Sequence, residues 1–598
     1  MSSDQKKFLP INYANREFSE IRGDLLEMAE RFYPETFQDF SEASFGAMMI
    51  DSVAYVADQL NFYLDYSVNE SFLDTSFQLD NVLRHGRVLG YKHSGRPSTF
   101  GEVAIYVQVP ASDSGLGPDT TYIPILSRGT RFTSKNGLSY MLTENIDFSD
   151  PANQIVVAKV NNATGAPTHY AIKSYGSVVS GRLSQQSFSV GGYQRFKALA
   201  LNNSNVVEII SVYDAEGNQY FEVEYLSQDM VYKEVINSNY KNDNVPSIMK
   251  PMLVSRKFIV ERSGDGVVLQ FGSGDESESD VVANPQNVAI DVFGKNYVTD
   301  TTFDPTRLSK NRSYGTVPVN TTLFVTYRTV SPGNSNVAVN SVNAVANLSM
   351  NFTDPTGLSA AKISEIKQSI EVSNEKPITG VTSNPSTGEI KRRIFDTFPT
   401  QNRAVTQADY ESLAYRMPGK FGSVKRVTVF KDQDSMKRNL NMYVISEDSF
   451  GKLTKTNRTI KNNLKTWLND YRMINDTIDI LDPYIINLGV DFVIRLQNGA
   501  DKDNTLGLAI SHVAAKFSNG FFIGEPMQVS DIYSELKKVE GVMDVVRVKI
   551  TDKSGGQYSA TTFNVNKNMD QDGTQLLAPA NAVFEIKYPS VDIKGKIK

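Results

Sequence analysis

The residues that most resemble a metal site lie in a polar loop near the C-terminus. They imitate the first half of a calcium-binding EF-hand loop and are Asn568, Asp570, Asp572 and Gly573. An EF-hand loop needs a carboxylate at its first position and a bidentate Glu at its twelfth. Here those positions hold Asn568 and Pro579, so two of the strongest ligands are missing. We therefore expect a polar surface turn rather than a calcium site.

Two segments partly resemble phosphate-binding loops. Around Gly451-Lys452, a P-loop would need an earlier Gly and a following Ser or Thr, but those positions hold Ser446 and Leu453. The glycine-rich residues 271–274 lead from a predicted strand into an acidic stretch, which would repel a pyrophosphate. A tight turn between strands explains both segments, and neither predicts nucleotide binding.

Acid–base and metal chemistry have few residues to draw on. The chain has no Cys, which excludes disulfides, thiolate metal sites and cysteine nucleophiles. Its four His residues are far apart in the sequence, at His85, His93, His169 and His512. The loop acids Asp265 and Asp275 could form a glycosidase pair, but no pattern places them in one cleft. We predict that the chain is not an enzyme and uses no metal or cofactor.

Length and composition describe a large globular protein. With 598 residues, about four folded units are expected. Lys and Arg number 61 against 67 Asp and Glu, a net charge of −6, so no general basic field favours nucleic acid as a partner. We find no signal-peptide-like stretch and no apolar run long enough to span a membrane. The chain is therefore expected to fold where it is made and to use no membrane partner.

The first hundred residues have helical periodicity. Apolar residues recur at three- and four-residue steps in residues 18–32, 45–64 and 79–89. The second of these helices is apolar over more of its circumference than one core requires. It belongs either to a bundle within the chain or to a bundle completed by another chain. For the second interpretation the interface residues are Met48, Met49, Tyr55, Val56, Phe62 and Tyr63.

The remaining sequence turns first to strands and then to a mixture. From about residue 100 the apolar period is two, and residues 256–260 and 267–271 are typical of a β-hairpin. In residues 359–598 helices alternate with strands. Thr406 to Asp409 resembles a capping box, Tyr484–Leu496 is a long predicted strand, and Ser530 is a predicted N-cap. The predicted fold class is α+β and multidomain, with an N-terminal helical bundle segment, a β-rich middle and mixed α/β C-terminal domains.

Five segments follow from this pattern. They are an N-terminal helical region at 1–98, a β-rich middle domain at 99–262, a second β-rich domain at 263–375, a connecting helix–strand region at 376–435 and a C-terminal α+β domain at 436–598. Gly-, Pro- and Ser-containing stretches at 331–334 and 384–388 are candidate hinges.

Several stretches together resemble a known family. They include MMIDSVAYVADQLNFYLDYSVNESFL (48–73), TYRTVSPGNSNVAVNSV (326–342), QNRAVTQADYESLAYRMPG (401–419) and IGEPMQVSDIYSELKKVEGVMDVVRVKI (523–550). The chain resembles baseplate wedge proteins of contractile-tailed phages, of the T-even gene product six type, within the baseplate J-like family. The chain departs from the family pattern in two places. In the segment 271–274, Ser273 stands where the family's Phe-Gly-acid-Gly turn usually has an acid. In the segment 326–342, Ser335 is inserted between Asn334 and the pair Asn336-Val337. The resemblance covers 15–110 and 320–550 well and 110–260 poorly.

The resemblance implies a structural protein of the virion tail baseplate, made in the host bacterial cytoplasm. Two copies would join one larger wedge protein in a two-to-one heterotrimer, and homodimers would link wedges into a ring around the hub. Rearrangement of that ring would trigger sheath contraction, and other wedge, hub and sheath-initiator proteins would be further partners. The 263–375 segment would be the baseplate J-like domain, and 436–598 would carry dimerisation.

Two helices of the C-terminal half are candidates for the dimer interface. Their residues are Tyr410, Leu413, Ile532, Tyr533 and Leu536. Alternatively, both helices simply cover the sheet. A different class of function, a tail adhesin or spike that binds host surface glycans, would explain the Asn-, Ser- and Thr-rich middle, although we see no repeats.

Overall fold

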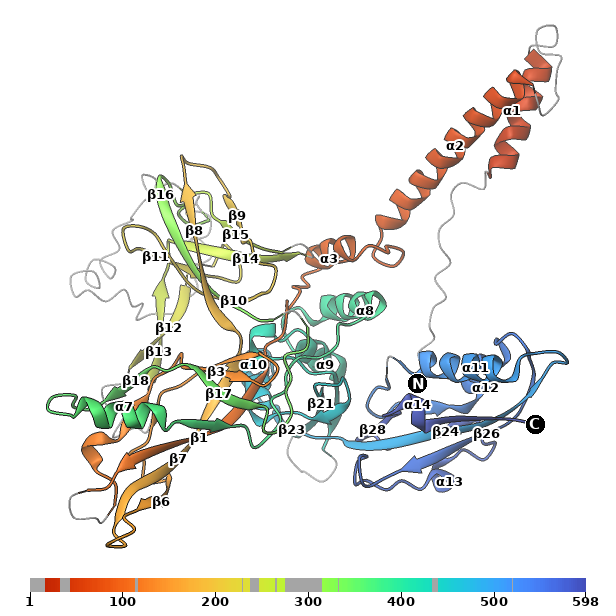
Figure 1. Ribbon diagram of the computed structural model, residues 1–598. Coiled ribbons are helices and arrows are strands. Elements are labelled where there is room, and N and C mark those ends of the chain that lie inside the picture. The colour runs from red at the N-terminus through yellow and green to blue at the C-terminus, as the bar shows by residue number, and fades with distance from the viewer. Residues whose placement is uncertain are drawn as a thin grey trace. The chain divides into compact units, whose positions relative to one another are not determined.

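The computed structural model describes residues 17–32, 44–112, 117–228, 230–236, 247–263, 266–274, 314–331, 333–432, 439–518 and 520–598. Contacts divide the chain into two units (Figure 1). The first unit holds the residues up to His93 together with Asn384–Gln401, and the second holds Ser94–Ser383 and Asn402–Lys598. Asp265 and Asp275, the acidic residues after Gly274, and Pro332 of the first candidate hinge lie outside the described residues.

The first unit is helical. Its helices are α1 (Phe18–Phe32), α2 (Phe45–Glu70), α3 (Leu79–Val88) and α8 (Thr387–Thr397), followed by the 3-10 turn η3 (Phe398–Thr400). Ser44 caps α2 by accepting a hydrogen bond from the Ala47 backbone NH at 3.0 Å. A small core joins α3 to α8, formed by Val82, Tyr91, Ile390 and Ile394.

The helix α8 was not expected from sequence. The stretch 384–388 looked like a flexible hinge, but Ser386 is the N-cap of α8 and accepts a hydrogen bond from the Glu389 backbone NH at 3.3 Å. Gly86 allows α8 to lie close to α3, because a Cβ there would be 2.8 Å from Cδ1 of Ile394. Thr387 and Gly388 are therefore the first residues of a packed helix, and a hinge at 384–388 stays a prediction.

The second unit opens with an antiparallel sheet in the order β17-β3-β4-β7-β1-β19, with β6 paired to β7. Its strands are β1 (Phe100–Pro110), β3 (Arg131–Ser134), β4 (Ser139–Leu142), β6 (Gln154–Val160), β7 (Pro167–Ser180), β17 (Val342–Asn347) and β19 (Glu371–Ser373). A three-stranded sheet beside it contains β2 (Pro124–Leu126), β5 (Ile146–Asp147) and β18 (Met350–Phe352). The helix α7 (Ala360–Gln368) places Ile366 in the same core.

A second seven-stranded sheet has the order β8-β16-β10-β11-β14-β15-β9. Its strands are β8 (Arg182–Val190), β9 (Ala198–Ala200), β10 (Val206–Tyr213), β11 (Gln219–Glu222), β14 (Lys257–Ser263), β15 (Gly266–Phe271) and β16 (Thr321–Thr329); a hairpin of β12 (Met230–Ile236) and β13 (Ser247–Leu253) lies apart. The predicted hairpin is confirmed, since β14 pairs antiparallel with β15. Because β16, β17 and β19 return to sheets begun earlier, the expected boundary near residue 262 does not separate the sheets.

The C-terminal part of the second unit contains two four-stranded sheets, each packed against helices. The first has β20 (Arg426–Lys431), β21 (Asn439–Glu447), β22 (Leu453–Lys455) and β23 (Thr477–Leu481) with helices α9 (Gln407–Tyr415) and α10 (Arg458–Asn469). The second has β24 (Tyr484–Leu496), β26 (Val542–Lys553), β28 (Ala582–Glu585) and β29 (Ile593–Ile597) with α11 (Lys502–Lys516) and α12 (Val529–Lys537). The predicted segment 436–598 thus spans most of one sheet and all of another.

Of the two helix caps predicted in this part, one is confirmed and one is wrong. The capping box is confirmed, because the Thr406 side chain accepts from the Asp409 backbone NH and the Asp409 carboxylate accepts from the Thr406 backbone NH. Ser530 is not an N-cap: α12 begins one residue earlier, at Val529, after Gln528. The overall prediction of an α+β chain with N-terminal helices, a β-rich middle and a mixed C-terminal region is confirmed.

Candidate assembly interface

The most prominent surface feature of the first unit is the apolar exterior of α2. Ten large apolar side chains of this helix are between 49% and 74% exposed: Phe45, Met48, Met49, Val53, Tyr55, Val56, Leu60, Phe62, Tyr63 and Leu64. Its buried residues are Ala47, Ala54 and Glu70. A helix of a monomeric globular protein normally buries its apolar face. The apolar side chains of α2 are instead exposed, which is typical of a surface that binds another protein.

Helix α1 covers only one side of α2. The two helices lie side by side as a hairpin (Figure 1). Ile21 of α1 is buried, as are Ala47 and Ala54 on α2, which lie seven residues apart on one face. The Arg22 Nε and Asp51 Oδ1 atoms, 2.5 Å apart, add an ion pair along this contact. The small alanines let α1 approach closely, and the ten apolar side chains elsewhere on α2 stay exposed among the described residues.

Eight of the ten exposed apolar side chains form two heptad seams. The first seam has the spacing 4-3-4-3 that places side chains on one stripe of a coiled coil, and it contains Met49, Val53, Val56, Leu60 and Tyr63. At about 100° per residue, this stripe lies roughly opposite the alanine face that α1 covers.

The second seam repeats every seven residues and lies about a quarter turn from the alanine face. It contains Met48, Tyr55 and Phe62. The ring of Tyr66 stacks on that of Phe62, with centroids 6.3 Å apart, which extends the seam by one turn. With α1 on its third side, α2 has room for two further helices, one on each seam.

All six residues predicted for a shared bundle lie on these seams and are exposed. Their contact with a partner stays a prediction. Val53 and Leu60 complete the first seam; both belong to the apolar stripe at 45–64 but were left out of the six interface residues. The 4-3 spacing was the signal that could have found them, because it separates one stripe from the other.

A polar network fixes the end of α2 against α3. The buried Glu70 carboxylate accepts hydrogen bonds from the Phe77 backbone NH at 2.7 Å and from Asn81 Nδ2 at 2.8 Å. Burial raises the pKa of Glu70, but these hydrogen bonds outweigh burial, so the pKa lies below its usual value. His85 Nε2 lies 2.9 Å from the Glu70 carbonyl oxygen. These bonds order the turn between α2 and α3.

The predicted dimer-interface residues require a correction. Tyr410, Leu413, Ile532 and Leu536 are buried in cores of this chain, because α9 and α12 cover their own sheets. Tyr533 is half-buried, and its hydroxyl accepts a hydrogen bond from the Val548 backbone NH at 3.0 Å. The first four side chains cannot reach a partner while the sheets are intact, so the alternative that both helices cover the sheet describes them.

The segments considered for metal or phosphate binding have structural roles. In the EF-hand-like loop, the Gly573 backbone NH donates to the Asp570 carbonyl oxygen in a tight turn. A Cβ on Gly272 would lie 2.3 Å from the carbonyl oxygen of Tyr314, so this glycine permits close backbone approach. Among the described residues, no group of three or more His, Asp or Glu could hold a metal ion. No helix in the described ranges is long and apolar enough to cross a membrane.

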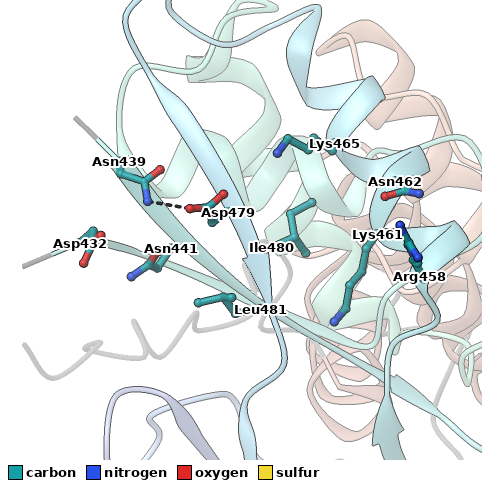
Figure 2. Close-up of a pocket in the computed structure, with 10 residues that line it drawn as sticks. All are labelled: Asp432, Asn439, Asn441, Arg458, Lys461, Asn462, Lys465, Asp479, Ile480 and Leu481. Atoms are coloured by element: carbon teal, nitrogen blue, oxygen red, sulfur yellow. Dashed lines mark hydrogen bonds between the residues drawn. The ribbon is translucent and has the colours of Figure 1, made fainter. Parts of the chain in front are cut away.

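A polar hollow of about 340 Å³ lies between α10 and strands β21 and β23 (Figure 2). Arg458, Lys461 and Lys465 enter it from the helix, and Asn439 and Asp479 from the strands (Figure 2). Lys461 is held by an ion pair to Asp482, 2.7 Å away, and Asn439 Nδ2 donates to Asp479 at 2.8 Å. The mixture of charges favours no single ligand class, and we assign none.

Comparison with known proteins gives a match to the N-terminal helices of this chain. Residues 17–88 match a family model described as the N-terminal domain of a bacteriophage baseplate protein. The match supports a baseplate protein. It spans α1, α2 and α3 and therefore contains both seams. No curated protein matches the chain.

Two solved assemblies show a distant likeness. A chain in the cryo-EM structure of the anti-feeding prophage baseplate is 10% identical, with 94% of this chain and 89% of that chain covered and a TM-score of 0.24. A chain in the TssK-TssF-TssG baseplate subcomplex of the type VI secretion system is 9% identical, with 73% and 95% covered and a TM-score of 0.22.

Proposed function

We propose that this chain is a non-enzymatic structural subunit of a phage tail baseplate wedge, in which its N-terminal helices complete a bundle with helices of other baseplate proteins. The observation that carries the proposal is the pair of exposed seams on α2. The family match to a baseplate N-terminal domain, which covers this helix, supports it.

The energetics favour the use of both seams together. Burying the exposed half of an apolar side chain contributes on the order of 1 kcal/mol, about half of the value for full burial. The five side chains of the first seam would then contribute about 5 kcal/mol, which only offsets the lower range of the cost of association. One seam alone would bind weakly, so a stable bundle needs contacts on the second seam as well.

Two seams suit a three-member bundle, because each member of such a bundle faces two neighbours. In the proposed wedge these members are two copies of this chain and one larger wedge protein. We propose further that homodimers link six wedges into a ring around the hub, and that rearrangement of this ring triggers sheath contraction. The side chains of that ring contact lie elsewhere than Tyr410, Leu413, Ile532 and Leu536, which the chain's own sheets bury.

Site-specific photo-crosslinking in assembled tails tests the bundle. A photoreactive residue at Leu60 probes the first seam and one at Phe62 probes the second, and both side chains are more than half exposed in the free chain. We expect each position to crosslink to a baseplate protein, with different partners or different copies for the two seams. A chain that crosslinks at neither position, and that instead binds host glycans, would replace the wedge proposal with the adhesin alternative.

A further inference from the structure

The strand β6 is an edge strand without the usual protection. It pairs with β7 on one side, and within the described residues no strand pairs with its other side. All seven of its residues are exposed. The large apolar ones are Ile155, Val156, Val157 and Val160, exposed by 48%, 61%, 50% and 51%. Because neighbours along a strand point to opposite faces, the strand presents apolar side chains on both faces.

Comparison with β8 shows how unusual this is within the same chain. β8 also lies at the end of its sheet order. Its sequence, RLSQQSFSV, is mostly polar and begins with the charged Arg182. β6, QIVVAKV, has a single charge at Lys159 and neither Pro nor Gly. Charges, prolines and short length are the devices that keep exposed edges from pairing with other chains, and β6 has little beyond Lys159 and an irregular register at its C-terminal end.

We propose that β6 pairs antiparallel with β6 of a second copy of this chain, about a two-fold axis at Val156. The open edge favours a strand as the occupant, since a strand pairs with the whole row of exposed backbone groups at once. This inference concerns the β-rich middle and goes beyond the proposed role of the helices.

The sequence of β6 is complementary to itself in this register. Val156 meets Val156 of the copy, and Ile155 meets Val157, so apolar side chains meet across the axis. Lys159 falls opposite Asn153, so no like charges oppose each other. The centre of pairing lies in residues 154–157, where the register with β7 is regular. A two-fold contact also closes both edges at once and leaves no edge for further growth.

The contact is small. A seven-residue strand pair lies well below the roughly 1,200 Å² at which stable protein interfaces begin. The pairing is therefore expected to be weak between free copies and to strengthen when other contacts hold two copies together.

Engineered cysteines give a clean test, because the chain has no Cys of its own. Residues directly opposite in an antiparallel pair have Cα atoms roughly 4.5–5.5 Å apart, within the range that a disulfide spans. In the full-length chain at high concentration under mild oxidation, Val156→Cys should form a disulfide-linked dimer. Ile155→Cys and Val157→Cys should crosslink to each other when mixed, and much less when each is alone.

The matched control is Leu183→Cys on β8, an edge-strand residue that is 47% exposed. Equal crosslinking of Leu183→Cys and Val156→Cys would show random collision and overturn the proposal. Amide hydrogen exchange of residues 154–160 in assembled tails supplies the second measurement. Slowed exchange without the 156–156 crosslink would mean that a strand of a different protein occupies the edge, which also overturns self-pairing.

Discussion

The double substitution Met49→Asp and Val56→Asp tests the first seam of α2 most sharply. Both side chains are about half exposed, at 49% and 55%, and lie on the side of α2 away from α1. In the free chain an aspartate at either position stays in water. In a closed bundle the same aspartate loses its water without gaining a cationic partner.

The magnitude follows from that difference. Each substitution removes about 1 kcal/mol of apolar burial that the bundle would gain. Each also buries a carboxylate, which costs on the order of several kcal/mol if the charge stays unpaired. The sum is at least about 4 kcal/mol, a loss of roughly 10³-fold in affinity. In the free chain, exposed substitutions change the free energy of unfolding by about 0.5 kcal/mol each.

The assay is co-purification of the full-length chain with the larger wedge protein, with circular dichroism as the test of folding. We expect the variant to fold and to lose the partner. The matched control is Met543→Asp with Val546→Asp, a Met and a Val on β26 that are 64% and 44% exposed. If the α2 variant co-purifies as well as the natural sequence, or if both variants fail equally, the seam is not the interface.

Three further substitutions test the fold of the two units. Arg328→Ala should lower the free energy of unfolding by about 3 kcal/mol in denaturant titration, because it removes a buried guanidinium that pairs with Glu208 at 3.0 Å. Glu585→Gln should flatten the dependence of stability on pH. Burial raises the pKa of Glu585, so the contribution of this carboxyl to stability is largest when it is protonated and is lost as pH rises through its folded-state pKa. Unfolding midpoints measured between pH 4 and 7 that run parallel for the two proteins would contradict this. Ser386→Ala should cost about 1 kcal/mol, seen as faster hydrogen exchange in α8, because Glu389 loses its capping acceptor.

Local signals in the sequence predicted several elements correctly. Apolar spacing located α2 from its first residue, and the bounds predicted for β24 coincide with those observed, Tyr484–Leu496. The capping box at Thr406 was readable because its two hydrogen bonds join residues only three apart. Such features depend on neighbouring residues, so the sequence contains what is needed to predict them.

The errors came from contacts between distant segments. The strands β16 and β17 join sheets begun more than a hundred residues earlier, and no local pattern records that pairing. The helix α8 was not predicted, because its buried face, Ile390 and Ile394, is defined by its contact with α3. Leu536 and Ile532 looked like interface residues because a sequence does not show whether an apolar helix face covers its own sheet.

The candidate site was partly predictable for the same reason. That α2 carries more apolar surface than one chain needs could be inferred from its circumference alone, and this is why six of its side chains were named in advance. The division of that surface into two seams required knowing that α1 covers the face of Ala47 and Ala54. The strand β6 escaped notice because a run such as Ile155–Val157 is equally typical of a buried strand.

The central claim is that α2 completes a bundle with other baseplate proteins, and the mass of the complex in solution tests it most directly. The full-length chain is measured alone and after mixing with the other tail proteins encoded beside it. We predict that two copies recruit one larger protein into a two-to-one complex that can grow towards six-fold rings. A stable trimer of this chain that does not bind those proteins would contradict this claim. The residues on α2 would then not form an interface with other baseplate proteins.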